Sequence, residues 1–385
     1  MSRIIVLGSG AWGTAIALSL HRRGGHRISQ WAHSPEAAQE MIDAGENTLF
    51  LPGFPIPKEI AITGDNAAVA DAEIVVSVVP SEFLRSTLAR LGPHLHAGQI
   101  VVSATKGVEN RTYLRMTEVI ADCLAGPVAQ TAEQFQRAST AGLSSYANPD
   151  TELEVFREDS APDVSSSGIE VAPRSPAGLV LPIGAFSGPS FALEVAQGQP
   201  TAVTVAFDDA EIAARIQNEF SSESLRLYTS TDVIGVELGG ALKNVIAIAA
   251  GVAAGVGLGY NSAAALITRG IAEITRLAVA CGGRRETLAG LSGVGDLVLT
   301  CTGSLSRNRT VGQALGQGRH LPEILASLGG KVAEGVLTTR AALGLARQRG
   351  IEMPITEQME LILDAGKDPR EAIKDLMLRP GKDEL

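Results

Sequence analysis

The sequence predicts an α/β N-terminal domain with a mostly parallel β-sheet, followed by an all-α C-terminal domain. In residues 1–230, short apolar runs alternate with helical segments, a pattern typical of strands buried on both faces of a parallel sheet. In residues 231–385, Ala, Leu and Ile recur at helical spacing, and no strong strand pattern is present. At 385 residues, the chain is long enough for two or three domains.

Composition limits the classes of partner and compartment. A formal net charge of −10 argues against a nucleic-acid partner. Three scattered cysteines are typical of reduced thiols in a cytoplasm and not of a disulfide framework. No basic, apolar leader precedes the first predicted strand, and no apolar run reaches the ~20 residues of a membrane span. We therefore expect a cytoplasmic protein with no membrane span, and we predict no metal site.

The first strand and helix enclose a glycine pattern. The apolar run 3–7 is followed by a GxGxxG spacing and then by helical character; the three glycines are Gly8, Gly10 and Gly13. Such glycines allow a tight turn, close approach of the backbone to a pyrophosphate, and close helix–strand packing. A second strand over 26–31 completes the pattern. We therefore predict a Rossmann-like, dinucleotide-binding domain over residues 1–230.

The second strand lacks the acidic residue that usually follows such a loop by about 20 positions. Ala32, His33 and Ser34 stand where a carboxylate would bind the ribose of NAD. Because nothing there repels a 2′-phosphate, the site favours NADP or tolerates both NADP and NAD, although the local sequence offers no Arg to bind the phosphate. An alternative role for His33 is to cap the next helix.

Further apolar runs of the first domain end in polar motifs. The three motifs are Pro80-Ser81, Thr105-Lys106-Gly107 and Ser187-Gly188-Pro189-Ser190. Because parallel strands end at one edge of the sheet, where ligands bind, we expect these motifs to face the same crevice as the glycine loop. Lys106 at a strand end therefore favours a ligand contact over an ordinary solvated lysine. The domain closes with runs at 201–207 and 224–230, around a helix near 208–220.

Residues 125–178 interrupt this pattern. The segment is rich in Ala, Ser, Pro and Thr, has no sustained periodicity, and carries eight acidic against three basic residues. Such a composition is typical of a surface loop. We predict an acidic, loop-like insertion that the fold tolerates; the alternative is that it binds a partner.

A single cation, Lys243, lies within the small and apolar run of residues 235–257. On a helix its neighbours one turn away are Gly239, Gly240, Ile246 and Ala247. Since three of these are small, we expect open space beside the ammonium. Burial lowers the pKa of an amine and prepares a lysine for proton exchange near neutral pH. We therefore predict a catalytic acid/base; the alternative is a structural ion pair, for example with Glu237.

A polar cluster follows further along the chain. Asp296 comes after a glycine-rich turn, and the next predicted helix opens with Ser306, Arg307 and Asn308, with Ser306 as its N-cap. These residue types at a helix N-terminus offer donors to an anion, and Arg binds phosphate bidentately. The alternative is a solvated basic cap. Glu334, between glycines, is a weaker indication of a site.

Seven motifs occur in one order along the chain: GSGAWGTAIA, ATKG, SGPSFA, ELGGALKNVIAIAAG, GLGY–N–ALITRG, GVGDLVLTCTG–SRNR and EMPIT. In this combination the chain closely resembles the bacterial NAD(P)-dependent glycerol-3-phosphate dehydrogenase family, over nearly its whole length except 125–178. The resemblance implies reversible, NAD(P)H-dependent reduction of dihydroxyacetone phosphate to sn-glycerol 3-phosphate, which supplies glycerophospholipid synthesis. It also implies a homodimer formed through the helical domain.

The resemblance assigns roles to individual residues. Lys243 matches the catalytic acid/base of the family. Substrate-binding positions are matched by Lys106, Gly188, Ser190, Lys243, Asp296, Ser306, Arg307 and Asn308. Cofactor-binding positions are matched by Gly8, Gly10, Ala11, Trp12, Gly13, His33, Lys106, Ala192, Arg307, Val332 and Glu334. Ala11 replaces a Ser of many relatives, which removes a hydroxyl donor and keeps the backbone N–H. Residues 231–385 are therefore predicted to bind the substrate and to carry the catalytic residue.

Two other functions remain open from the sequence. A hydroxyacid or ketopantoate-type reductase shares the architecture and also uses a lysine; it needs a carboxylate site, which residues 306–309 could provide, and only the family resemblance argues against it. A non-catalytic NAD(P)H sensor would signal through the acidic insertion, but it has no need for Lys106, Lys243 and Asp296 together.

Overall fold

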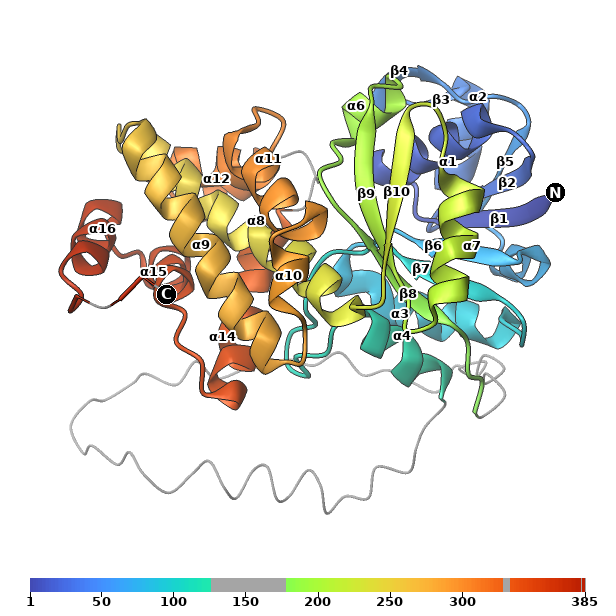
Figure 1. The fold of residues 1–385 in the computed structure, drawn as a ribbon. Helices are drawn as coiled ribbons and strands as arrows, with labels where there is room; N and C mark the ends of the chain where they lie inside the picture. The colour runs from blue at the N-terminus through green and yellow to red at the C-terminus, as the bar shows by residue number, and fades with distance from the viewer. Residues whose placement is uncertain (126–177, 328–332, 382, 385) are drawn as a thin grey trace, which may run out of the picture.

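The computed structural model describes residues 1–125, 178–327, 333–381 and 383–384, and these form two lobes that lie side by side (Figure 1). The first lobe is a β-sheet covered by helices, and the second contains only helices among the residues described. The predicted fold class is confirmed. Helix α8 (Val233–Gly255) follows the last strand and leads the chain from one lobe into the other.

An eight-stranded sheet forms the first lobe, in the order β10-β9-β8-β7-β6-β1-β2-β5. Its strands are β1 (Ser2–Leu7), β2 (His26–Trp31), β5 (Ile60–Thr63), β6 (Ile74–Ser77), β7 (Ile100–Ser103), β8 (Ile183–Ser187), β9 (Thr201–Ala206) and β10 (Leu225–Ser230). β5 and the separate hairpin of β3 (Glu46–Asn47) and β4 (Leu51–Pro55) were not predicted from the sequence. These strands are short, and β4 contains the strand breakers Pro and Gly.

Helices cover both faces of the sheet. Along β1, Ile4 and Val6 pack on one face and Ile5 and Leu7 on the other. The first face carries α1 (Ala11–Arg23), α2 (Pro35–Ala44), α6 (Ala192–Ala196) and α7 (Ala210–Phe220). The second face carries α3 (Ser81–Leu91) and α4 (Met116–Leu124). Burial on both faces explains why the strands are continuous apolar runs.

Strand direction fixes the edge of the sheet at which a ligand can bind. β1, β6, β7 and β8 are parallel, so the motifs that follow them lie along one edge. β8 and β9 are antiparallel, so β10 ends at the opposite edge. α8 starts there, with Asp232 as its N-cap. Lys243, ten residues after Val233, is about 15 Å further along the helix, which returns it toward the ligand-binding edge.

The second lobe is built around α8. The other helices are α9 (Tyr260–Ala280), α10 (Arg285–Leu288), α11 (Asp296–Thr302), α12 (Arg307–Gly316), α13 (Leu321–Ala326), α14 (Glu334–Arg349), α15 (Pro354–Ala365) and α16 (Pro369–Met377). A short π-type turn, η3 (Leu291–Gly295), leads into α11. Leu238, Ala241 and Ile248 of α8 are completely buried, which makes this helix the core of the lobe.

Glycines let α8 and α12 pack backbone against backbone. A Cβ atom at Gly251 would lie 2.1 Å from the carbonyl oxygen of Arg309, and one at Gly312 would lie 1.9 Å from that of Ile248. No side chain larger than hydrogen fits at either position. This close approach holds the start of α12 beside the middle of α8, where Lys243 lies.

Among the described residues, α8 is long and apolar enough to cross a membrane, judged by length and composition alone. The bent pair 285–302 and 307–316 meets the same test only if it is counted as one span. The apolar window of α8 is 89% buried inside the fold. A core helix meets the same criterion, so this is weak support for a membrane span.

The predicted acidic insertion lies almost entirely outside the described residues. At its two ends, the N–H of Gly178 donates a hydrogen bond to the carbonyl oxygen of Ala125 at 3.2 Å. The chain therefore leaves the sheet lobe and returns to it at one place, between α4 and β8.

Candidate active site

The glycine loop between β1 and α1 has the geometry that a dinucleotide requires. Gly8 has φ +124°, a conformation that L side chains rarely adopt, and a Cβ at Gly13 would lie 2.2 Å from the carbonyl oxygen of Gly8. A Cβ at Gly10, the N-cap of α1, would meet none of the described atoms within 4 Å. The tight turn, the close packing and the open helix N-terminus fit a bound pyrophosphate.

Ala11, Trp12 and Ala192 lie beside this loop. All three are partly buried and pack on the core of the first face of the sheet. The ring centroids of Trp12 and Phe186 are 6.2 Å apart. Ala192 begins α6, which packs against α1. The fold thus brings these predicted cofactor residues together.

His33 is exposed just after β2. Its alternative role as a helix cap is wrong, because the hydroxyl of Ser34 caps α2 by accepting from the N–H of Ala37 at 3.2 Å. Arg90, at the end of α3, donates to the carbonyl oxygen of His33 at 3.4 Å, and its guanidinium lies 5.4 Å from the ring centroid of Trp31. The local sequence offered no Arg here; the fold supplies one from 57 positions away.

Asp296 joins the two predicted lysines. Its buried carboxylate accepts from Lys243 Nζ through one oxygen and from Lys106 Nζ through the other, the latter at 2.7 Å. Thr300, one turn further along α11, accepts from Lys243 at 2.8 Å. Lys106 comes from the sheet lobe, and Lys243 and Asp296 come from the helical lobe. This lysine cluster (Lys106, Lys243, Asp296 and Thr300) therefore forms only where the lobes meet.

The surroundings of Lys243 lower the pKa of its ammonium group. Burial lowers the pKa of Lys243 to about 8; the carboxylate of Asp296 raises this pKa in part, and the ammonium of Lys106 lowers it. Such a lysine can give and accept a proton near neutral pH. An ammonium has three N–H donors. Among the described residues, Asp296 and Thr300 take two of them, which leaves the third for a ligand oxygen.

Two expectations about the surroundings of Lys243 are wrong. The glycines one turn away do not leave open space: a Cβ at Gly239 would lie 2.5 Å from the carbonyl oxygen of Ser292, and one at Gly240 would lie 2.2 Å from Ser187 Oγ. Gly239 makes room for neighbouring backbone and Gly240 for the side chain of Ser187, and neither borders a cavity among the described residues. The suggested partner Glu237 binds Arg115 and Thr117 instead. Lys243 does form an ion pair, but its partner is Asp296.

The turn after β8 reaches the lysine cluster. Gly188 has φ +150°, and a Cβ there would lie 2.9 Å from Cα of Val203. Its carbonyl oxygen accepts from Ser190 Oγ at 3.1 Å and from Lys106 Nζ at 3.5 Å. The predicted residues Gly188 and Ser190 therefore lie against Lys106.

The start of α12 is held in place by its own polar side chains. Ser306 Oγ accepts from the N–H of Arg309 at 3.2 Å, so the predicted N-cap is confirmed. Asn308 Oδ1 accepts from the N–H of Gly335 at 3.0 Å, which ties α12 to α14. Arg307 is exposed, and it is the cation of this group that an anionic ligand can reach.

Glu334 begins α14 beside this group, and it accepts from Asn244 Nδ2 at 3.3 Å. Burial raises the pKa of Glu334, and three cations of the site oppose this: Arg307, Lys106 and Lys243. These interactions place Glu334 next to the lysine cluster. Val332, predicted with it as a cofactor residue, lies outside the described residues.

Two polar residues of the site were not predicted from the sequence. Thr300 follows Asp296 by four positions, the spacing that puts two side chains on one side of a helix. With Asp296 at the start of a helix, this spacing alone would have predicted Thr300 as its neighbour. Asn244 binds Glu334, but nothing in the sequence distinguishes it from any other polar residue of a helix.

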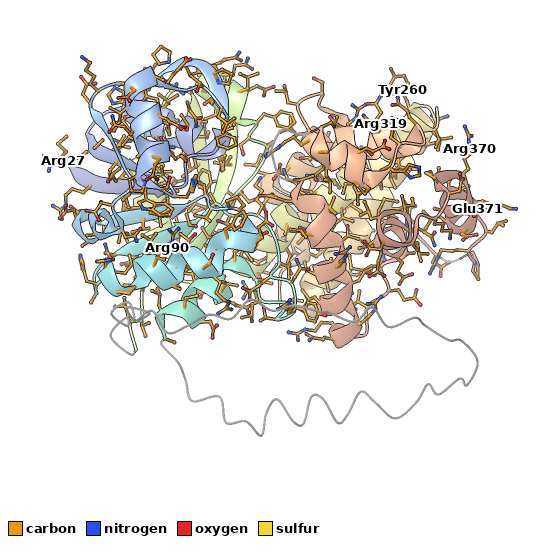
Figure 2. All side chains as sticks on the ribbon, turned by 180° about the vertical axis from the view of Figure 1, so that it is seen from behind. Arg27, Arg90, Tyr260, Arg319, Arg370 and Glu371 are labelled. Atoms are coloured by element: carbon orange, nitrogen blue, oxygen red, sulfur yellow. The ribbon has the colours of Figure 1, made fainter. Side chains whose placement is uncertain are left out.

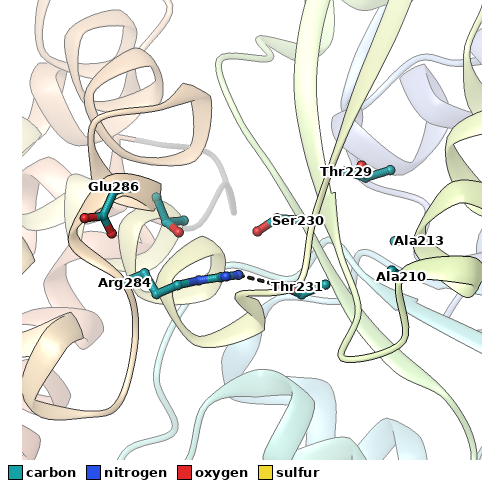
Figure 3. A pocket seen from close by; sticks show the side chains of 8 residues that line it. Ala210, Ala213, Thr229, Ser230, Thr231, Arg284 and Glu286 are labelled. Carbon is teal, nitrogen blue, oxygen red and sulfur yellow. Dashed lines mark hydrogen bonds between the residues drawn. The ribbon is translucent and has the colours of Figure 1, made fainter.

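A cavity of about 630 Å³ lies elsewhere, between α7, the end of β10 and α10 (Figure 3). It is lined by Ala210, Ala213, Thr229, Ser230, Thr231, Arg284, Glu286 and Thr287. Within it, Arg284 donates to the hydroxyl of Thr231 at 2.8 Å. The cavity contains none of the predicted site residues, and because β10 ends at the edge opposite to β7, it lies away from Lys106.

Comparison with known proteins covers almost the whole chain. The family model for the N-terminus of NAD-dependent glycerol-3-phosphate dehydrogenase matches residues 3–132 and 170–213, and the model for its C-terminus matches 232–374. The glycerol-3-phosphate dehydrogenase [NAD(P)+] of Acidobacterium capsulatum is 52% identical over 388 residues, 100% of both chains. That of Koribacter versatilis is 50% identical over 386 residues, 100% of this chain and 99% of its own.

Solved structures agree with this result. The crystal structure of glycerol-3-phosphate dehydrogenase from Coxiella burnetii matches with a TM-score of 0.81 at 33% identity, over 98% of this chain and 99% of that one. A ketopantoate reductase from Ralstonia eutropha matches with a TM-score of 0.50 at 16% identity, over 96% of this chain and 99% of that one, and it shares the fold alone.

A dinucleotide loop on one lobe and, on the other, a buried lysine whose pKa is lowered fit a nicotinamide-dependent oxidoreductase, and that is the class to which this protein belongs. Within the class, the two family models and the full-length relatives agree. The chain belongs to the NAD-dependent glycerol-3-phosphate dehydrogenase family, and its cofactor is NAD or NADP. The ketopantoate-type reductase and the non-catalytic sensor are thereby set aside.

Proposed function

We propose that Lys243 is the acid/base with which this enzyme reduces the C2 carbonyl of dihydroxyacetone phosphate, reversibly, to sn-glycerol 3-phosphate. The observation that carries the proposal is the buried ammonium of Lys243, which keeps one N–H donor for a ligand where the lobes meet. Reduction of a ketone creates an alkoxide, which is costly unless a proton reaches the oxygen. Lys243 gives this proton in reduction and takes it back in oxidation.

The other residues hold the ligands around Lys243. When bound, the reduced nicotinamide supplies the hydride to C2. Residues 1–230 bind the cofactor through the glycine loop and contribute Lys106, Gly188 and Ser190 to the substrate site, and residues 231–385 contribute the rest of that site. Asp296 holds the ammonium groups of Lys106 and Lys243 beside each other and orients them, since it accepts from both. Arg307, at the N-terminus of α12, attracts the substrate phosphate.

A turnover assay tests this function. Purified protein is mixed with dihydroxyacetone phosphate, dihydroxyacetone or ketopantoate, and the loss of NADPH or NADH absorbance is followed. We expect oxidation with the phosphorylated substrate and a kcat/KM at least about 100-fold lower without the phosphate, because polar groups built to bind it are left unpaired. A folded protein that binds nucleotide but turns over none of these substrates would contradict the proposal.

The preference between the two cofactors is also a proposal, in favour of NADPH. Arg90 donates a hydrogen bond to the carbonyl oxygen of His33 at the end of β2, where the adenosine ribose of a dinucleotide lies. Arg90→Gln should raise the KM for NADPH about tenfold, the loss of one charge-assisted hydrogen bond, and should leave the KM for NADH within about twofold. Equal effects on the two cofactors would exclude a role of Arg90 in the preference.

A homodimer and a cytoplasmic location complete the proposal. Tyr260 is 94% exposed at the outer end of the helical lobe (Figure 2), and the nearby Leu258 is 39% exposed. Neighbouring exposed apolar side chains suit a protein interface. Light scattering should give twice the 40.0 kDa mass of the chain; a monomer at micromolar concentration would contradict the dimer.

A further inference from the structure

We infer that Asn47, Gln30 and Thr14 are positioning residues for the cofactor, because they orient the glycine loop from its buried side. The inference rests on the proposed cofactor site at this loop. The three side chains come from β3, β2 and α1. They are buried polar groups, with exposed fractions of 2%, 0% and 0%. Figure 1 shows the β3–β4 hairpin beside α1.

Two side-chain amides bind carbonyl groups of the loop. Asn47 Nδ2 donates to the carbonyl oxygen of Ser9 at 2.7 Å, and Gln30 Nε2 donates to that of Gly8 at 3.1 Å. Both amides also donate to Thr14 Oγ1, at 2.9 Å and 3.1 Å. The hydroxyl of Thr14 therefore links the two amides, and the loop is held by two long-range contacts at consecutive residues.

Planarity of the peptide group converts these contacts into an orientation of N–H donors. In a trans peptide, the C=O and the N–H point in opposite directions. Because the carbonyl groups of Gly8 and Ser9 point toward the buried amides, the N–H groups of Ser9 and Gly10 are turned away from them, toward the open space at the N-terminus of α1. These are donors that a pyrophosphate needs. A loop already ordered in this way loses less entropy when the cofactor binds.

Asn47 is itself fixed by the hairpin. Its Oδ1 accepts from the N–H of Phe50 at 3.1 Å, so the donating Nδ2 faces the loop. A short hairpin at the edge of the sheet lobe, with no direct place in the site, thus has a role in cofactor binding.

The same lobe offers a matched control. Gln99 is 0% exposed, and its Nε2 donates to the carbonyl oxygens of Val69 and Ala72, both at 2.8 Å. It is a buried amide that holds a loop in the same manner but belongs to no ligand site. A purely structural role would make Asn47→Asp and Gln99→Glu equivalent.

The experiment compares these two variants in the full-length protein. A carboxylate in place of the Asn47 amide repels the carbonyl oxygen of Ser9. We expect the Kd of NADPH, by fluorescence titration at pH 8, to rise at least about tenfold, with kcat at saturating cofactor within about threefold. Gln99→Glu should change Kd less than about twofold, whatever its effect on Tm. At pH 5.5 a buried carboxyl group is protonated and can donate, so the affinity of Asn47→Asp should recover.

Wild-type affinity in a folded Asn47→Asp protein, or an equal loss in Gln99→Glu, would overturn the inference. If Asn47→Asp does not fold, two variants that remove or keep the hydroxyl of Thr14 test the inference instead. Thr14→Val should raise Kd and Thr14→Ser should keep it; equal Kd values would again overturn the inference. Failure of the proposed function is distinguishable, since it would appear as a wild-type protein that binds NADPH without turning over dihydroxyacetone phosphate.

Discussion

Asp296 and Glu237 are buried carboxylates of the helical lobe, and each binds a cation from the sheet lobe. Glu237 accepts from Arg115, and from the N–H and hydroxyl of Thr117 at 2.8 and 2.7 Å. Asp296 accepts from Lys106 and Lys243. Arginine keeps its proton at any relevant pH, whereas a buried lysine can release it. The partner cation therefore makes the first bridge, between Glu237 and Arg115, a permanent link between the lobes. It makes the second bridge, between Asp296 and the two lysines, a candidate for proton transfer.

The largest effect is expected at the lysine of the second bridge. Lys243→Ala removes the proposed acid/base, and kcat should fall about 10³-fold, within the range of general acid–base catalysis. The Kd of NADPH should stay within about twofold, because the glycine loop is on the other lobe. Steady-state kinetics and a binding titration measure both. Turnover within tenfold of wild type would exclude Lys243 as the acid/base.

Breaking the first bridge should act on stability and not on chemistry. Glu237→Ala leaves the guanidinium of Arg115 buried without that partner, and the free energy of unfolding should fall by about 3–5 kcal/mol in urea titrations. As a control, Glu352→Ala breaks an exposed ion pair with Arg379 and should cost less than about 1 kcal/mol. Equal losses would mean that the Glu237 bridge does not hold the lobes together.

The two bridges also show which features of the site the sequence can reveal. Lys243 and Asp296 were identified because charged residues within small, apolar or glycine-rich runs are unusual. The sheet was identified because its strands are buried on both faces and are therefore continuous apolar runs. Both signals are local in the chain, and both led to the correct elements.

Pairing between distant residues was not predictable. Glu237 binds Arg115, 122 positions away, and Arg90 reaches His33 from α3. Such contacts depend on how whole elements pack, which no local pattern encodes. For the same reason the glycines beside Lys243 suggested open space, whereas in the fold Gly239 contacts the backbone of η3 and Gly240 contacts the side chain of Ser187 at the end of β8.

The pH dependence of the reduction should show the pKa of Lys243 in the second bridge. Since the pKa of Lys243 is about 8 and the acid form is required, kcat/KM for reduction should be constant below pH 8 and fall about tenfold per unit above it. Asp296 raises the pKa of Lys243, so Asp296→Asn should move this decline to lower pH. A pH profile of Asp296→Asn that declines at the same pH or higher would show that the carboxylate does not hold the proton on Lys243.

The smallest effect is expected at Thr300, the uncharged residue that contacts Lys243 in the second bridge. Its hydroxyl accepts from Lys243 at 2.8 Å and donates to the carbonyl oxygen of Asp296 at 2.6 Å, so it orients the ammonium without carrying charge. Thr300→Val keeps the shape and removes these bonds, which should lower kcat/KM about fivefold, or about 1 kcal/mol. Thr300→Ser should restore it. If both variants lose activity equally, the methyl group and its packing matter at this position, and Asp296 alone orients Lys243.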